Sequence, residues 1–382
     1  DEANVPFRTL PGLSDLATGD IRISDLREVS LEDLLGREPI DLHEPKLKQY
    51  FSGKRVLVTG GGGSIGSELC RQLCGFDPKL LVVIDQTEYN LYQVEMEVKQ
   101  HFPNVTFIPY LLDVKDQQSV EMVFAEHKPD VVFHAAAYKH VPLLEHQLFV
   151  AIKNNVMGTK IVAQAASKYG ASRFVLVSTD KAVNPTNIMG ATKRIAEMYC
   201  QNLNAQSTTD FMTVRFGNVL GSAGSVVPLF KRQLKAGGPL TVTHPEITRF
   251  FMTIPEACQL ILQASLMGEG GEIFVLKMGA SIKISFLAEQ MIKLSGKKVN
   301  EDIKIEYTGL RPGEKLYEEL FHSGETLVPT THEKISKANS RQLDWDVIKA
   351  SVSELQTCSE KRLSDEALEC LKHLVPECEL CT

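Results

Sequence analysis

An acidic and a basic side chain, Asp180 and Lys181, stand next to each other directly after the apolar run RFVLVS at 173–178. Elimination of water next to a carbonyl group requires a base for the acidic C–H proton and an acid for the departing hydroxyl. A Lys and an Asp at the end of a strand supply both groups. The alternative interpretation of the same two residues is an exposed pair of loop charges.

Glycines at a regular spacing mark a second chemical feature, the segment TGGGGSIG at 59–66, which follows the apolar run RVLV. Gly60 suits a tight turn, Gly63 lets the backbone approach a pyrophosphate, and Gly66 permits close packing of a helix on a strand. A helix that begins here presents N–H donors and a partial positive charge to an anion. The pattern predicts a dinucleotide-binding loop made of Thr59, Gly60, Gly63, Ser64, Ile65 and Gly66.

Two acidic positions extend this cofactor site. Asp85 ends the next apolar run, about 20 residues beyond Gly66, where a carboxylate accepts hydrogen bonds from ribose hydroxyls. Because a carboxylate would repel a 2′-phosphate, the sequence favours NAD over NADP; a solvated turn residue is the alternative. Asp113 and Val114 follow the third run and are predicted to contact the edge of the adenine.

The elements that position these residues follow from alternating patterns. Short Val- and Ile-rich runs, apolar on both faces, alternate with helical stretches, as a parallel sheet covered by helices requires. The expected strands are 55–60, 80–85, 105–110, 130–135, 173–178 and 211–216, and further helices are expected at 255–267, 285–295, 344–357 and 364–374. The predicted fold class is therefore α/β, with a doubly wound parallel sheet and a smaller C-terminal lobe.

We expect four regions along the chain. They are a polar arm at 1–50, with a short helix after Ser30, a cofactor-binding core at 51–220, a lobe mixed with the core at 221–330 and a helical tail at 331–382.

The amino-acid composition limits which partners the protein is expected to bind. Against 48 Asp+Glu stand 41 Lys+Arg, a formal net charge of −7, which argues against a nucleic-acid binder. No apolar run is long enough to cross a bilayer and no signal peptide is present, but the chain begins at Asp1, so we expect a fragment of a longer protein. Eight scattered cysteines fit a reducing compartment. Cys370, His373, Cys378 and Cys381 could bind a metal, but a frayed helical tail is favoured and no metal is predicted.

Several motifs together resemble a known family. The glycine pattern and the N-V-x-G-T segment at 155–159 resemble the extended short-chain dehydrogenase/reductase superfamily, whose Y-x-x-x-K pair appears here as Met189 and Lys193. Met cannot transfer a proton, and its presence is a mark of one class. That class is the large, membrane-anchored UDP-N-acetylglucosamine 4,6-dehydratases of polysaccharide and glycan biosynthesis. The resemblance rests on TGGGGSIGS (59–67), DQTEYNLY (85–92), HAAAYKHVPLLE (134–145), STDKAVNPTNIMGATKR (178–194), RFGNVLGSAGSVVPLF (215–230) and GLRPGEKLYEEL (309–320), with LEDLLGR at 31–37.

The resemblance implies a redox-neutral reaction in three steps, in which carbon 4 of the sugar is oxidised by NAD, water leaves across carbons 5 and 6, and hydride returns to carbon 6. It assigns Lys181 as the base at carbon 5, Asp180 as the acid at the carbon 6 hydroxyl, and Thr179 as the partner of the carbon 4 oxygen. Lys193 would hold the nicotinamide ribose. The group that deprotonates the carbon 4 hydroxyl is left open between Asp180, Lys193 and water. Further cofactor contacts are implied at Ala135, Ala136, Ala137 and Asn155.

The substrate site is also implied by resemblance. Asn218 would contact the diphosphate or the sugar, Val227 and Pro228 would flank the uracil, and Lys139 and His140 would border the sugar. Arg249 and Arg311 with Glu314 would clamp the UDP, because an Arg fork meets phosphate oxygens bidentately. A solvated surface Arg and a structural His are the alternatives.

Three other functions compete with the dehydratase, namely a UDP-sugar 4-epimerase, a small-class dehydratase that inverts carbon 5, and an inactive NAD sensor or scaffold. The large class implies retention at carbon 5. The resemblance also implies a homo-oligomer that pairs through helices flanking the sheet. It implies an N-terminal membrane domain outside this fragment, and therefore a place on the cytoplasmic face of the bacterial inner membrane.

Overall fold

A computed structural model describes residues 8–9, 27–28, 45–322, 324–339 and 343–380, which form two compact units. The unit called here the sheet unit comprises Leu42–Gly217, Ala257–Lys277 and Arg311–Thr382. The lobe unit comprises Asn218–Glu256 and Met278–Leu310. The two units alternate along the chain, and the four-part division expected from the sequence stays a prediction.

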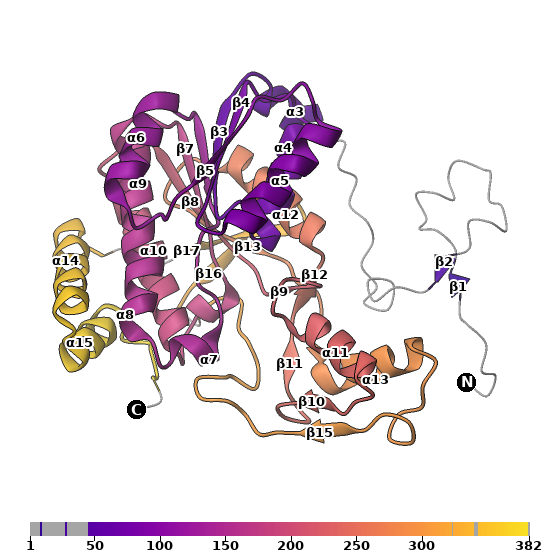
Figure 1. Cartoon of the computed structure of the whole chain (residues 1–382). Coiled ribbons are helices and arrows are strands. Elements are labelled where there is room, and N and C mark those ends of the chain that lie inside the picture. Colours follow the sequence, from indigo (N-terminus) through magenta and orange to yellow (C-terminus); the bar gives the residue numbers. More distant parts are fainter. Residues whose placement is uncertain (1–7, 10–26, 29–44, 323, 340–342, 381–382) are drawn as a thin grey trace. The chain divides into compact units, whose positions relative to one another are not determined.

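The sheet unit is built on nine strands in the order β16-β17-β13-β8-β7-β6-β3-β4-β5 (Figure 1). Strands β13 to β5 are parallel to one another, and β17 and β16 add antiparallel edges. Their bounds are Arg55–Thr59 (β3), Leu80–Asp85 (β4), Phe107–Leu111 (β5), Val131–His134 (β6), Arg173–Val177 (β7), Asp210–Arg215 (β8), Ile273–Leu276 (β13), Thr326–Pro329 (β16) and Ile335–Asn339 (β17). The predicted fold class is confirmed, and all six expected strands form; β13, β16 and β17 were not expected.

The strand order fixes where a ligand belongs. From β3 the chain passes to β4 on one side and, after β5, returns to β6 on the other side of β3. In a doubly wound sheet such a reversal opens a crevice at the carboxyl ends of the strands. The glycine loop at 60–63 leaves β3 at this point, so the topology agrees with the motif.

Helices cover both faces of the sheet. In Figure 1 α4 and α5 lie on one side and α6, α9 and α10 on the other. The helices of the sheet unit are Pro45–Phe51 (α3), Ser64–Cys74 (α4), Glu88–His101 (α5), Gln117–His127 (α6), Val141–Leu144 (α7), Leu148–Ala151 (α8), the π-helix Ile152–Met157 (η2), Gly158–Lys168 (α9), the 3-10 turn Asp180–Ala182 (η3) and Ile188–Asn204 (α10). Helix α12 (Ile254–Met267) begins in the lobe unit and continues into the sheet unit.

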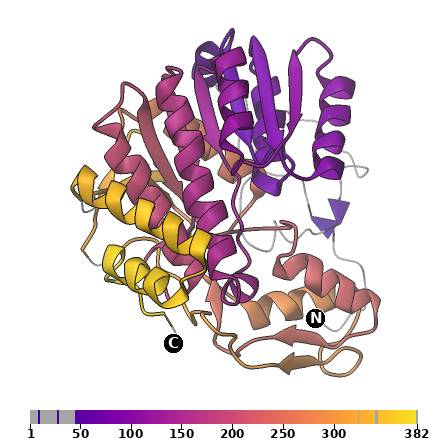
Figure 2. The same ribbon diagram turned by 60° about the vertical axis from the view of Figure 1, so that its left-hand side comes forward.

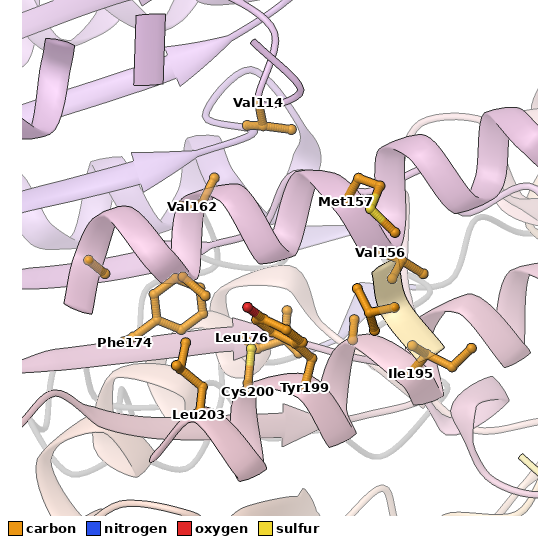
Figure 3. Packing of buried hydrophobic residues seen from close by; sticks show 14 of the residues in the cluster. Val114, Val156, Met157, Val162, Phe174, Leu176, Ile195, Tyr199, Cys200 and Leu203 are labelled. Atoms are coloured by element: carbon orange, nitrogen blue, oxygen red, sulfur yellow. The ribbon is translucent and has the colours of Figure 1, made fainter. Parts of the chain in front are cut away.

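The largest core lies between the sheet and the α9–α10 face. Figure 3 shows Tyr199 and Ile195 of α10 among Phe174 and Leu176 of β7 and Val162 of α9. These side chains are almost fully buried. Burial of apolar surface at about 25 cal/mol per Å² makes such a core the main source of stability.

Two C-terminal helices complete this core. Helices α14 (Trp345–Lys361) and α15 (Ser364–Leu374) lie beside α10 in Figures 1 and 2. Ile348, Val352 and Leu371 are fully buried in the same cluster, and the ring of Trp345 lies 5.5 Å from that of Tyr199. Both helices expected from the sequence are confirmed. Their apolar faces bury α10. Beyond α15 the Glu379 N–H donates to the Pro185 carbonyl oxygen at 3.0 Å and Leu380 packs against the cluster that contains Met189, so the frayed tail expected there is wrong for the described residues.

The lobe unit contains short elements. They are Asn218–Val219 (β9), Val226–Lys235 (α11), Leu240–Val242 (β10), Thr248–Arg249 (β11), Phe251–Met252 (β12), Ile282–Lys283 (β14), Ile284–Leu294 (α13) and Ile305–Tyr307 (β15). Strand β9 pairs with β12, β10 with β15 and β11 with β14. The helices expected at 255–267 and 285–295 are confirmed as α12 and α13.

The arm expected at 1–50 falls mainly on residues that the structure does not describe; Arg8–Thr9 (β1) pairs with Arg27–Glu28 (β2). The short helix expected after Ser30, and the LEDLLGR segment, lie outside the described residues. Within the described ranges, no helix has both the length and the apolar composition that crossing a bilayer requires.

Candidate functional site

The glycine loop has the geometry of an anion cradle. Gly60 takes a φ of 67°, which favours glycine, and a Cβ there would lie 2.7 Å from the backbone of Ala136. At Gly66 a Cβ would lie 2.1 Å from the Gly60 carbonyl oxygen, so only glycine lets α4 start this close to the strand. The N-cap of α4 is Gly63, which has no side chain to accept from the first N–H groups. These donors suit a phosphate.

A cavity of about 180 Å³ opens beside the loop at the carboxyl ends of β3, β4 and β6. Asp85 forms part of its wall, with one oxygen accepting from the Gly62 N–H at 2.8 Å and the other from the Thr87 N–H at 2.7 Å. Each carboxylate oxygen keeps a second acceptor site for a ribose hydroxyl. The lining residues are Gly60, Gly63, Ile84, Asp85, Gln86, Thr87, Asn90, Leu112, Asp113, Val114, Ala135, Ala136, Ala137, Tyr138 and Asn154.

Other predicted cofactor residues lie behind this wall. Thr59 is fully buried, with its hydroxyl 2.7 Å from His134 Nδ1, and His134 Nε2 lies 3.0 Å from the Thr159 hydroxyl. Burial and the charge of Lys193 lower the pKa of His134 to about 3, so its ring is neutral. Thr59 therefore supports the loop from beneath, and its side chain does not line the cavity. Ser64, Ile65 and Gly66 are not lining residues either.

Asn155 also supports the cavity wall without lining the cavity. It lies in the π-helix η2, accepts from the Tyr138 N–H at 2.9 Å and donates to the Tyr138 carbonyl oxygen at 3.0 Å. It donates as well to the Thr192 hydroxyl of α10 at 3.1 Å. This buried amide therefore fixes the 135–138 loop of the cavity to the helix that carries Lys193.

Thr179, Asp180 and Lys181 form a connected group after β7. The Thr179 hydroxyl donates to Asp180 Oδ1 at 2.9 Å, and Lys181 Nζ donates to the same oxygen at 3.0 Å. The Asp180 side chain is 1% exposed, whereas that of Lys181 is 19% exposed. Asp180 Oδ2 has no hydrogen-bond partner among the described residues. Asp180 is thus buried and Thr179 and Lys181 are partly buried, which differs from the exposed pair of charges that was the alternative.

Glu318, which the sequence reasoning did not select, completes this group. Its carboxylate oxygen Oε1 lies 3.3 Å from Lys181 Nζ, and its side chain is 3% exposed. Lys181 therefore lies between two buried carboxylates. The one available signal was that Glu318 belongs to the GLRPGEKLYEEL segment.

Lys193 and Met189 lie one turn apart at the start of α10. Lys193 Nζ donates to the Val177 carbonyl oxygen at 2.8 Å, and burial lowers the pKa of this amine to about 8. Met189 is buried among Leu144, Ala151 and Ile188. The position that holds Tyr in the superfamily pattern is here part of an apolar cluster, and it supplies no proton.

A buried network of ion pairs and hydrogen bonds holds the ends of β7 and β8. Arg215 donates to Glu197 at 2.6 Å and to Glu325 at 2.8 Å, and the Ser178 hydroxyl donates to Glu197 at 2.6 Å. Burial alone would raise the pKa of Glu197, but the charges of Arg215 and Arg194 hold it below the usual value. The network joins β7, β8, α10 and the segment before β16.

The segment 311–319 contacts the turn 179–187 after β7, which carries the predicted catalytic residues and is therefore called the catalytic turn. The Gly313 carbonyl oxygen accepts from Asn187 Nδ2 at 3.0 Å, and Lys315 Nζ donates to the Val183 carbonyl oxygen at 3.1 Å. Arg311, predicted to clamp UDP with Glu314, is exposed and paired with Glu314 itself at 3.1 Å. A phosphate would have to compete with that carboxylate for the guanidinium.

The remaining substrate residues fall in both units. Lys139 and His140 follow β6 in the sheet unit; desolvation lowers the pKa of both, and the charges of Lys139 and Arg311 lower that of His140 further. In the lobe unit Asn218 is half-buried on β9, its N–H donating to the Phe250 carbonyl oxygen at 3.0 Å, while Arg249 is buried on β11. Val227 and Pro228 lie in the first turn of α11. These substrate roles stay predictions.

Comparison with known proteins agrees with this geometry. The family described as polysaccharide biosynthesis protein matches residues 56–340. The chain belongs to this family. It is 52% identical over 328 residues to the capsular polysaccharide biosynthesis protein CapD of Staphylococcus aureus and 46% identical over 360 residues to the probable polysaccharide biosynthesis protein EpsC of Bacillus subtilis. It covers 55% and 60% of these relatives, and they cover 85% and 94% of this chain.

Similar proteins and solved structures of the same fold include more than one kind of enzyme. A UDP-glucose 4-epimerase of Rickettsia canadensis is 37% identical over 282 residues, covering 72% of this chain and 79% of its own length. Pen of Bacillus thuringiensis has a TM-score of 0.70 at 35% identity, covering 77% of this chain and 92% of its own. DesIV of Streptomyces venezuelae, a dTDP-glucose 4,6-dehydratase solved with NAD, shares the fold with a TM-score of 0.59 at 23% identity, covering 70% and 87%. The chain thus has the sheet fold of these nucleotide-sugar enzymes.

Among the described residues, no group of three or more His, Cys, Asp or Glu side chains is arranged to hold a metal ion. Cys370 and Cys378 are close to the α14–α15 core, and Cys381 lies outside the described residues.

Proposed function

We propose that this chain dehydrates UDP-N-acetylglucosamine to its 4-keto-6-deoxy derivative, with retention at carbon 5 and with NAD recycled in each turnover. The observation that carries the proposal is the hydrogen-bonded group of Thr179, buried Asp180 and Lys181 after β7, in a family member that has Met189 where a Tyr would serve a simple dehydrogenase. An elimination needs an acid and a base together, and this group offers both.

The residues of the sheet unit fit NAD. A Cβ at Gly60 or Gly66 would close the cradle, and the cavity wall offers the Asp85 carboxylate to a ribose without an Arg that would attract a 2′-phosphate. Lys193 and the 135–137 loop would hold the nicotinamide end. When bound, NAD accepts the hydride of carbon 4 and returns it to carbon 6.

The protein's own residues would move the protons. Thr179 donates to Asp180, so the carbon 4 hydroxyl proton can pass through the Thr179 hydroxyl to the Asp180 carboxylate. Asp180 then gives this proton to the carbon 6 hydroxyl as that group leaves as water. Lys181, when its amine has lost a proton, takes the carbon 5 proton and later returns one to the same carbon. The proton lost from the carbon 4 oxygen leaves in the water molecule, so the protons of one turnover balance without a Tyr.

The decisive experiment incubates the protein with UDP-N-acetylglucosamine in deuterated water and follows the products by proton NMR. We expect a 4-keto-6-deoxy sugar with deuterium at carbon 5. We expect Lys181→Ala to slow its formation by about 10²–10⁴-fold, the usual contribution of a general base. Lys168→Ala, at the end of α9 and so at the opposite edge of the sheet, is the matched control and should turn over normally.

The 37% identical epimerase relative gives the competing proposal, a UDP-sugar 4-epimerase. Formation of the galacto epimer without loss of water would support that function and refute dehydration. No turnover would refute both and favour the NAD-binding sensor. The membrane domain, the homo-oligomer and the place at the cytoplasmic face of the inner membrane remain proposals about the whole protein.

A further inference from the structure

We propose that Glu318 is a positioning residue for Lys181, orienting its amine and stabilising the ammonium that forms when Lys181 takes the carbon 5 proton. The inference rests on the proposed function, because it assigns a partner to the base of that reaction. Lys181 Nζ forms an ion pair with Glu318 Oε1 at 3.3 Å, and the same amine contacts buried Asp180 Oδ1 at 3.0 Å.

Burial gives this ion pair its strength. Glu318 is 3% exposed and Asp180 1% exposed, so water screens neither carboxylate well. A surface ion pair contributes little, whereas charges removed from water interact strongly and are costly to leave unpaired. The fold therefore gains from keeping the amine and both carboxylates together, which fixes the direction of the Lys181 side chain.

The segment that carries Glu318 is anchored to the catalytic turn at several points. Gly313 accepts from Asn187, Lys315 donates to the Val183 carbonyl oxygen, and Glu319 accepts from Asn184 at 2.9 Å. Glu318 lies between the last two anchors in sequence. It is therefore held to the turn by contacts that do not involve Lys181.

The proton steps explain why one carboxylate is insufficient. When Asp180 takes the carbon 4 proton it loses its charge, just before Lys181 must become an ammonium. Glu318 takes no part in this proton transfer, so its carboxylate is still beside Lys181 at that step. An opposite charge within about 4–6 Å favours the charged form of its partner. Other charged groups near the turn are Lys315 and Glu319 on the same segment, which pair at 2.9 Å, and Lys193 of α10.

The first test measures the protonation of Lys181 without turnover. Trace acetylation with acetic anhydride between pH 6 and pH 11, with mass spectrometry of the peptide that contains Lys181, gives the pH at which half of the amine reacts. We expect Glu318→Gln to move this midpoint down by about one pH unit. Glu319→Gln removes the same charge from the adjacent, exposed position and should leave the midpoint unchanged. An unchanged midpoint in Glu318→Gln overturns the inference.

The second test measures turnover in the same purified proteins, after circular dichroism and NAD titration have shown that each variant is folded. We expect Glu318→Gln to lower kcat about 10-fold with little change in KM, and to shift the acid limb of the pH profile toward lower pH. Glu318→Asp, which keeps the charge, should restore part of the rate. Wild-type kcat and pH profile in Glu318→Gln would overturn the inference while leaving dehydration intact. If the wild-type protein makes no dehydrated product, the proposed function fails, and the labelling midpoint still decides whether Glu318 controls Lys181.

Discussion

The glycine loop after β3 and the catalytic turn after β7 lie at the same edge of one sheet but are held in different ways. Backbone atoms of adjacent strands fix the glycine loop: Gly61 donates to the Ile84 carbonyl oxygen at 3.2 Å, and Gly60 lies against Ala136. Side chains from much later in the chain fix the catalytic turn, through the segment 313–319 and Glu325. Where backbone contacts dominate, a short motif determines the geometry; where remote side chains dominate, it does not.

The largest effect should come from removing a side chain of the remote network. Glu197→Ala leaves Arg215 buried with one of its two carboxylate partners. Breaking a buried ion pair costs about 3–5 kcal/mol, and we expect a loss of that size in the free energy of unfolding measured with urea. Glu319→Ala, at a half-exposed pair with Lys315, should cost less than about 1 kcal/mol. Equal losses in the two variants would show that the network does not hold the turn.

The glycine loop should respond to a single methyl group. Gly66→Ala places a Cβ 2.1 Å from the Gly60 carbonyl oxygen, a backbone atom that cannot move aside. Such overpacking costs about 1–3 kcal/mol, so we expect a lower melting temperature of the protein without NAD and weaker NAD binding. At Gly63 the distance is 3.2 Å, so Gly63→Ala should weaken NAD binding with a much smaller change in melting temperature. Calorimetric titration and thermal unfolding separate the two; matching destabilisation by both variants would contradict a specific role of Gly66.

The same difference explains what could be predicted from sequence. The Val- and Ile-rich runs predicted β3 to β8. The glycine loop and the spacing from Gly66 to Asp85 predicted a loop and a carboxylate that do meet at one cavity. The runs could not indicate the antiparallel edge of β16 and β17, because the sequences of these strands, TLVP and ISKAN, are not Val- and Ile-rich. Nor could they indicate Glu318 or the partners of Arg215, because an ion pair between distant residues leaves no local periodicity. The helix α14 could be predicted from its own sequence, but its packing against α10 could not.

The smallest expected change in the free energy of unfolding comes from a single residue that contacts both its own helix and the remote segment. Asn187 caps α10, accepting from the Gly190 N–H at 2.7 Å, and also donates to the Gly313 carbonyl oxygen at 3.0 Å. Asn187→Ala loses both contacts and should cost about 1 kcal/mol of stability. Asn187→Ser keeps an oxygen for the cap and loses the donor to Gly313, so its unfolding free energy should change by less than about 0.5 kcal/mol. If the remote segment positions the catalytic turn, Asn187→Ser should still lower kcat several-fold, because Gly313 and the segment carrying Glu318 lose one anchor. Urea unfolding and product formation, measured on both variants, give the two numbers. Wild-type kcat in Asn187→Ser would mean that the turn after β7, like the loop after β3, is fixed by its own neighbouring strands.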